Sequence, residues 1–224
     1  MTSCFNDPDY DSLPGIIPVF PLTGAFLLPT GYLPLNVFEP RYLNMLDDAL
    51  AGNRLIGMVQ PEAPENDPIA DAAALYPIGC LGRIISFEES GDGPVAMSLK
   101  GIIRFRIKAE LDLADGGYRR VRPDFSPYQD DLDVTPGALA DRPRLMASAQ
   151  EYFDHKDIHI DWESVDDVDG ASLVTALAMI CPLEPREKQA LLEAMDHNAR
   201  ARLLSSLMEM ALHGHGRDDD RVRH

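Results

Sequence analysis

The side chains that could form a covalent intermediate are few and poorly placed for it. The chain has three cysteines, Cys4, Cys80 and Cys181, and none has a histidine beside it in the sequence. A serine nucleophile would need a strained Gly-x-Ser-x-Gly elbow, and a phosphate loop would need Gly-x-x-x-x-Gly-Lys-Ser/Thr; the sequence contains neither. These patterns predict no catalytic residues, no cofactor site and no enzyme activity. Cys80 and Cys181 are interpreted as buried structural thiols.

The histidines could bind a metal ion only with help from elsewhere. His155 and His159 are four residues apart and would share one face of a helix that continued through them. A zinc site needs three or four ligands, and no His-Glu-x-x-His or Cys-x-x-Cys pattern supplies the rest. His213 and His215 are equally isolated. We therefore predict solvated histidines and no metal site.

Two charged residues lie among aromatic ones in the segment Phe38-Glu39-Pro40-Arg41-Tyr42. Charge beside aromatic side chains can mark a binding site. It can also satisfy main-chain groups and fix the corner where a strand passes into a helix. We favour the structural interpretation for Glu39 and Arg41, so that loss of Arg41 would reduce stability.

One predicted strand carries a row of cations at even positions: Lys100, Arg104, Arg106 and Lys108. They alternate with Ile103, Phe105 and Ile107, a pattern typical of a strand with one buried face and one wet face. The strip could bind RNA. However, the net charge of −17 repels polyanions, and carboxylates flank the strip, so nucleic-acid binding is disfavoured. The flanking carboxylates, which we expect to pair with the cations, are Glu88, Glu89, Glu110 and Asp112.

The elements that position these residues differ between the two halves of the chain. Residues 17–42 contain five prolines between short apolar runs, which excludes a continuous helix and favours short strands bent into a small barrel. Further predicted strands cover residues 55–59, 78–87, 95–108 and 118–121, with a turn at 88–94 and an exposed excursion at 61–77. One helix is expected from Glu39 to Gly52, with Leu43, Leu46 and Leu50 on its buried face.

The second half reads as helical. Asp141 can cap a helix over 142–156, and Asp169 a nearly all-apolar helix over 170–181 that should have no solvated face. Two more helices are expected over 184–195 and 198–213. The predicted organisation is a disordered tail at 1–14, a β-rich lobe at 15–127, a helical lobe at 128–213 and a disordered tail at 214–224, an α+β fold by segregation.

The last helix has an apolar arc wider than the ~100° that a helix packed on one side needs. The arc is either core covered on two sides, which we favour, or an exposed strip for a partner. The candidate partner residues are Leu204, Met208 and Leu212.

Several motifs in this chain resemble those of one known family, the N-terminal substrate-binding domain of Lon proteases. The opening motif residues are Pro18, Phe20, Pro21, Leu22, Pro29, Pro34, Leu35, Phe38, Glu39, Pro40, Arg41 and Tyr42. Later matches are Tyr76, Gly79, Cys80, Leu81, Ile84, Gly101, Arg104, Phe105 and the helix at 187–193. We expect the motif residues to be mainly structural.

The resemblance implies a β pseudo-barrel of the PUA-like type followed by a helical bundle. It also implies a stand-alone, non-enzymatic module of protein quality control that binds unfolded or extended polypeptide segments. Such a module would lack the ATPase and protease modules of full Lon enzymes. Residues 92–96 are similar to the Lon catalytic Asp-Gly-Pro-Ser-Ala motif, but Val95 has no nucleophilic atom. A separate protease or ATPase partner, oligomerisation, and adaptor, holdase or competitor roles all stay open.

The bulk properties favour a cytoplasmic protein. No apolar run approaches the ~20 residues of a membrane-spanning helix, and the acidic amino end does not read as a secretory signal. An odd number of widely spaced cysteines indicates reduced thiols.

Overall fold

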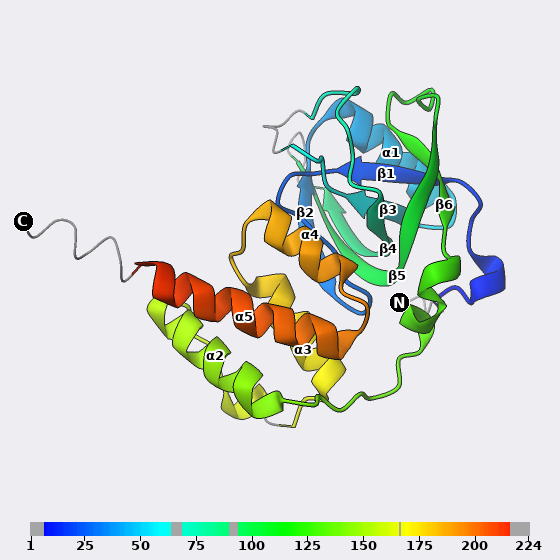
Figure 1. Cartoon of the computed structure of the whole chain (residues 1–224). Helices are drawn as coiled ribbons and strands as arrows, with labels where there is room; N and C mark the ends of the chain where they lie inside the picture. Colours follow the sequence, from blue (N-terminus) through cyan, green and yellow to red (C-terminus); the bar gives the residue numbers. More distant parts are fainter. Residues whose placement is uncertain (1–6, 64–68, 90–93, 166, 216–224) are drawn as a thin grey trace, which may run out of the picture. The chain divides into compact units, whose positions relative to one another are not determined.

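The computed structural model describes residues 7–63, 69–89, 94–165 and 167–215 (Figure 1). The chain forms two compact units, one that ends at Val134 and one that begins at Thr135. The first unit is β-rich and the second is helical, which confirms the predicted α+β class.

The β-rich unit is a barrel whose longest strand closes it. The strand order is β2-β5-β4-β3-β1-β6, and β5 also pairs with β6, so that β5, β4, β3, β1 and β6 form a closed ring. Strand β2 is attached to the outside of this ring through the first half of β5. The strands are β1 (Ile17–Pro21), β2 (Tyr32–Val37), β3 (Leu55–Val59), β4 (Ile78–Glu89), β5 (Val95–Leu111) and β6 (Arg120–Asp124).

Two glycines of the family motif allow close backbone contact inside the barrel. A Cβ atom on Gly101 would lie 1.9 Å from the carbonyl oxygen of Leu28. The N–H of Gly101 donates to Gly31 O (2.8 Å), and Thr30 N–H donates to Gly101 O (2.9 Å), so the segment before β2 is fixed to β5 here. A Cβ on Gly79 would lie 2.5 Å from the carbonyl oxygen of Met58. Any larger residue would push these strands apart.

Helix α1 (Pro40–Ala51) follows β2 and confirms the predicted boundaries, with Glu39 at the N-cap, Pro40 in the first turn and Gly52 at the C-cap. The predicted buried face was partly wrong, because Leu43 and Leu50 are only half-buried. The side chains that pack inward are Tyr42, Met45, Leu46 and Ala49. The helix is therefore rotated relative to the leucine pattern, so that the ring of Tyr42 meets the barrel.

Both ends of the β-rich unit extend further than predicted. Residues 7–14 were expected to be disordered, but they lie against the barrel and include a 3₁₀ turn, η1 (Tyr10–Ser12). The boundary at residue 127 was also placed too early, because η2 (Ser126–Leu132) belongs to the β-rich unit. Tyr128 and Leu132 pack against the barrel core, and Asp131 pairs with Arg104.

The helical unit contains α2 (Arg142–His155), η3 (Glu163–Val165), α3 (Gly170–Ile180), α4 (Pro185–Glu193) and α5 (His197–His215). Asp141 and Asp169 cap α2 and α3 as predicted. The expectation that α3 has no solvated face was wrong, because Ile180 is exposed. Among the described residues, no helix is long and apolar enough to cross a membrane.

Candidate functional site

The candidate site is the open edge of β2. Along its whole length, from Tyr32 opposite Lys100 to Val37 opposite Val95, β2 pairs with β5. Within the described parts of the chain no other strand pairs with it. Proline cannot donate to a strand ladder, so Pro34 fits only with its nitrogen pointing away from β5. By alternation the main-chain groups of Asn36 also point to the open edge, where a further strand could pair with them.

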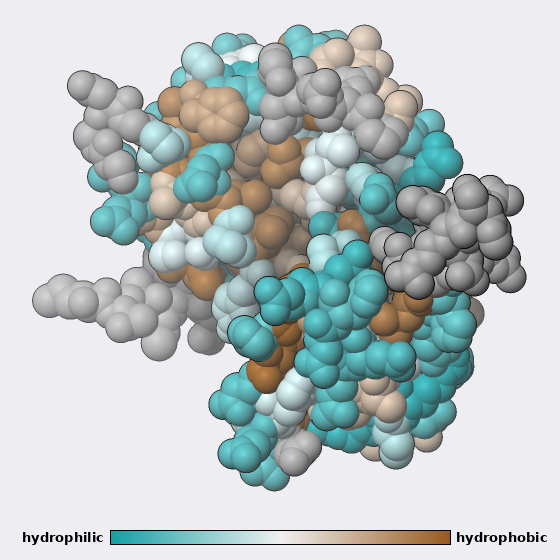
Figure 2. Space-filling model, turned by 90° about the vertical axis from the view of Figure 1, so that its left-hand side faces the viewer, coloured by the Kyte–Doolittle hydropathy of each residue, from teal (hydrophilic) through white to brown (hydrophobic). Residues whose placement is uncertain are grey.

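Large apolar side chains are exposed on and beside this edge. Tyr32 and Phe38 have 61% and 62% of their surface exposed. On β4, Ile85 and Phe87 are 46% and 43% exposed. Apolar side chains also gather visibly on the face of the molecule that Figure 2 shows. Exposed aromatic residues grouped in this way are typical of binding surfaces.

Two grooves run along β2, and Pro34, Leu35 and Asn36 line both of them. One groove, of 180 Å³, lies between β2 and the rings of Phe20 and Tyr42, whose centroids are 4.2 Å apart and whose planes are tilted by 33°. The other, of 440 Å³, lies over the paired ends of β2, β5 and β4. Its further lining residues are Ser86, Phe87, Glu88, Ala96, Met97 and Ser98. Alternate side chains of an extended chain could enter these grooves.

Arg41 holds the corner between β2 and α1. Its guanidinium binds Glu39 (3.0 Å) and Asp71 (2.6 Å) and donates to the main-chain oxygen of Ile69 (2.7 Å). Burial works against the charge, but Tyr42 and Glu39 outweigh it and raise the pKa of Arg41. Through these contacts Arg41 and Glu39 can fix this corner, and their mainly structural role stays a prediction. The contacts to Ile69 and Asp71 also attach residues 69–75 to this corner. These residues were predicted to be exposed, but Ile69, Ala73 and Leu75 are buried.

The cationic strip is neutralised mostly by partners that the sequence analysis did not name. Arg104, predicted to face water, is buried and bound to Asp131 (2.8 Å), because η2 covers this part of β5. Lys100 binds Asp7 (2.6 Å), and Lys108 binds Asp124 (3.5 Å). In the described structure Arg106 has no carboxylate partner.

None of the four carboxylates expected to pair with the strip does so in the described structure. Glu110, for example, pairs with Arg119. Intramolecular pairing is therefore observed for three of the four cations, Lys100, Arg104 and Lys108, but the predicted partners were wrong.

The candidate partner strip on α5 is not a surface. Leu204 and Met208 are fully buried inside the helical unit, and Leu212 is half-buried. The partner strip, which was the less favoured alternative, was wrong for Leu204 and Met208, because neighbouring helices cover α5 on more than one side. The wide apolar arc is mostly core.

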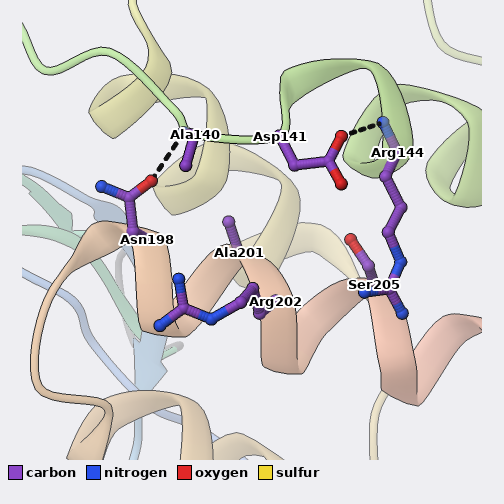
Figure 3. Close-up of a pocket in the computed structure, with 7 residues that line it drawn as sticks. All are labelled: Ala140, Asp141, Arg144, Asn198, Ala201, Arg202 and Ser205. Carbon is purple, nitrogen blue, oxygen red and sulfur yellow. Dashed lines mark hydrogen bonds between the residues drawn. The ribbon is translucent and has the colours of Figure 1, made fainter.

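A small pocket of 80 Å³ lies between the start of α2 and the first turns of α5 (Figure 3). Several of its polar groups already have partners: Asn198 accepts from Ala140 N–H (2.8 Å), Asp141 accepts from Arg144 N–H (3.2 Å), and Arg144 binds Glu209. Ligand pockets are usually ~300 Å³ or larger. We therefore interpret this pocket as part of the packing of the helical unit.

Cys80 and Cys181, the cysteines that the structure describes, are buried thiols, as expected. Burial raises the pKa of Cys181 to about 11, which keeps it protonated and unreactive. In the described ranges no group of three or more histidine, cysteine or acidic residues could hold a metal ion. Cys4, residues 92–93 of the Lon-like pentapeptide and the side chain of His215, the last residue of α5, lie outside what the structure describes. Val95 begins β5.

The sequence analysis missed three residues of the edge surface. Tyr32, Ile85 and Phe87 were not singled out, although Phe38, Pro34 and Leu35 were expected to be structural motif residues. The available signal was Pro34 within a strand, which indicates an edge strand. Identifying the neighbours of β2 required the strand order.

Comparison with known proteins agrees with this architecture. The curated relatives include Lon protease 2 of Myxococcus xanthus, 29% identical over 212 residues, and Lon protease of Anaeromyxobacter dehalogenans, 27% identical over 213 residues. The match covers 88% of this chain in both cases, but 24% and 23% of the relatives. The chain thus spans about a quarter of their length.

Two solved structures share the fold. A Lon N-terminal domain protein from Xanthomonas campestris is 24% identical, with a TM-score of 0.60 over 85% of this chain and 97% of that one. The N-terminal domain of Lon protease from Mycobacterium avium complex is 20% identical, with a TM-score of 0.56 over 87% and 98%. The model of the substrate-binding domain of the ATP-dependent protease La (Lon) matches residues 16–210. The chain therefore belongs to the Lon substrate-binding domain family.

Proposed function

We propose that this protein is a non-enzymatic module that binds unfolded or extended polypeptide segments along the open edge of β2. One observation carries the proposal: a strand with a single pairing partner is flanked by two grooves and by exposed aromatic side chains. Membership of the Lon substrate-binding domain family supports it.

The binding mode would be strand addition. The incoming chain would form main-chain hydrogen bonds with the outward groups of Asn36 and with the carbonyl of Pro34, and these bonds make little demand on sequence. Its alternate side chains would enter the two grooves, which favours apolar residues. Pro34 removes one donor from the edge, and this limits the open-ended pairing that leads to aggregation.

We place the function in the cytoplasm and in protein quality control, with a protease as the natural partner, because the curated relatives are Lon proteases. Adaptor, holdase and competitor roles all use the same edge. RNA binding is the weaker alternative, since three of the four strip cations already bind carboxylates within the chain.

The test measures binding of a fluorescently labelled, reduced and carboxymethylated protein, which is permanently unfolded, by anisotropy. Tyr32→Ser combined with Phe38→Ser should weaken binding by at least about tenfold, because buried aromatic residues dominate such interfaces. Both side chains are mostly exposed, so the variant should stay folded.

Leu113→Ser is the control, because Leu113 is an exposed apolar residue of the same unit that lies outside β2 and lines neither groove. It should bind like the wild type. The proposal would be contradicted if the wild type showed no saturable binding at protein concentrations of tens of micromolar. A dissociation constant in that range corresponds to a binding free energy of roughly −6 kcal/mol. Equal loss in the control and the double variant would reject the β2 edge as the site.

A further inference from the structure

Two cations lie side by side on neighbouring strands of the barrel, where Arg83 is buried and Lys100 is half-buried. Arg83 of β4 and Lys100 of β5 are register partners, so their side chains project from the same face of neighbouring strands. Like charges in this arrangement repel each other. An anion placed between them removes the repulsion, and the pair therefore has the charge pattern of an anion site.

The anion present is the chain's own Asp7. One carboxylate oxygen lies 2.6 Å from Nζ of Lys100 and the other lies 3.6 Å from Nε of Arg83. The Nε atom of Arg83 is buried and has no hydrogen-bond partner among the described residues. Asp7 thus uses only part of the donor capacity of this site.

The segment that carries Asp7 is loosely held. None of residues 7–12 is buried, and the hydrogen bonds of Asp9 are local, to Ser12. The next anchor is Leu13, which packs against the barrel core. Ion pairs with exposed carboxylates contribute little stability, so release of this segment requires little free energy.

The same segment forms one wall of a cavity of 410 Å³. Asp7, Pro8, Asp9 and Tyr10 line it together with Thr30, Lys100, Gly101, Ile102, Asp131, Leu132 and Val134. This volume is in the range of known ligand pockets, ~300–1,000 Å³. The seated segment shows the chemistry that fits: a carboxylate on the two cations and an aromatic ring three residues later.

We propose that Arg83 and Lys100 form a carboxylate-binding site for an acidic polypeptide segment, and that residues 7–12 occupy it in cis as an internal competitor. The expected partner is an extended segment with an aspartate or glutamate followed three positions later by an aromatic residue. The two cations lie on β4 and β5, next to Tyr32 of β2, which is opposite Lys100. The site recognises an acidic group through charge, whereas the β2 edge would bind extended chains through main-chain and apolar contacts, so the inference goes beyond the proposed function.

The probe is a labelled peptide with the sequence of residues 7–13, Asp-Pro-Asp-Tyr-Asp-Ser-Leu, blocked at both ends. Binding to the full chain is measured by anisotropy. A tethered competitor acts at roughly millimolar effective concentration, so its removal by Asp7→Lys should raise the affinity about tenfold. Lys100→Met in the Asp7→Lys background should return the affinity to the wild-type level.

Asp11→Lys is the matched control, because it makes the same charge change in the same segment at a residue without an ion pair in the described structure. It should bind like the wild type. A peptide with asparagine in place of its first aspartate should lose the gain, which identifies the carboxylate as the recognised group.

Equal affinity of wild type and Asp7→Lys, with both folded by circular dichroism, would overturn the proposal. If Asp7→Lys does not fold, Asp7→Asn takes its place and must meet the same requirement. A gain in affinity for a labelled single-stranded RNA with none for the peptide would overturn the assignment to polypeptides.

Discussion

The β2 edge and helix α5 both carry large apolar side chains, but these side chains are exposed at the β2 edge and buried on α5. Leu204 and Met208 of α5 are completely enclosed, whereas Tyr32 and Phe38 at the ends of β2 are mostly exposed. A helix can be covered on several sides by its neighbours. An edge strand has one pairing partner, and its other side stays open unless another chain covers it. An apolar helix face therefore says less about binding than an apolar strand at an edge.

The largest expected change in stability comes from a substitution in the buried face of α5. Leu204→Ala should lower the free energy of unfolding by about 2–5 kcal/mol, because it leaves a cavity in the core of the helical unit. Urea denaturation followed by circular dichroism measures this loss. The folded fraction should still bind the unfolded probe, and specific loss of probe binding with normal stability would restore α5 as a partner surface.

A smaller loss of stability is expected from a substitution at the corner between β2 and α1. Arg41→Met should lower the free energy of unfolding by about 1.5–3 kcal/mol, because three partners of the guanidinium lose a charged donor. Arg41→Lys should recover only part of this, since an ammonium group cannot reproduce the planar fork. Normal stability of Arg41→Met in a thermal melt would show that the corner does not depend on these contacts.

The stability of the protein should depend on pH through Glu209 of the helical unit, and not through the β2 edge. Hydrogen bonds from Arg144 and Ser148 lower the pKa of Glu209 from 4.5 to about 2 in the folded protein. The unfolded chain therefore takes up this proton first, so the stabilisation is present above pH 4.5 and is lost as the pH falls toward 2. The loss should be small, because the pair is partly exposed and screened by solvent.

Urea midpoints measured from about pH 5 down to about pH 2 would show this loss. Glu209→Gln should have a flatter profile than the wild type over that range. Identical profiles of the two proteins would contradict the role assigned to Glu209.

The smallest change in stability is expected for substitution of Phe38, whose ring is exposed at the end of β2. Phe38→Ser should change the free energy of unfolding by no more than about 0.5 kcal/mol, because the side chain is 62% exposed in the folded state. A loss as large as that of Leu204→Ala would mean that Phe38 belongs to a core, and would remove the contrast between the two regions.

Local signals in the sequence predicted much of the fold. The caps at Asp141 and Asp169, the start of α1 at Pro40 and the strand at residues 55–59 depend on a few adjacent residues, and all were placed correctly. Long-range relations were not predictable in this way. Arg104 alternates like a surface residue, but Asp131, 27 positions later, covers and neutralises it.

The candidate site was only partly predictable for the same reason. Phe38, Pro34 and Leu35 were recognised as motif residues, whereas their exposure depends on β2 lying outside the closed ring. Alternation assigns a side chain to a face, but it does not say whether another element covers that face. Only the strand order supplies that information.

The pairing of Ile17 with Val121 joins the two ends of the β-rich unit. A growing chain therefore cannot complete its barrel on the ribosome until nearly the whole unit has been synthesised, and contacts so distant in sequence form slowly. Until then the first strands present unpaired edges to the cell. The β-rich unit would thus pass through an aggregation-prone state during its own synthesis.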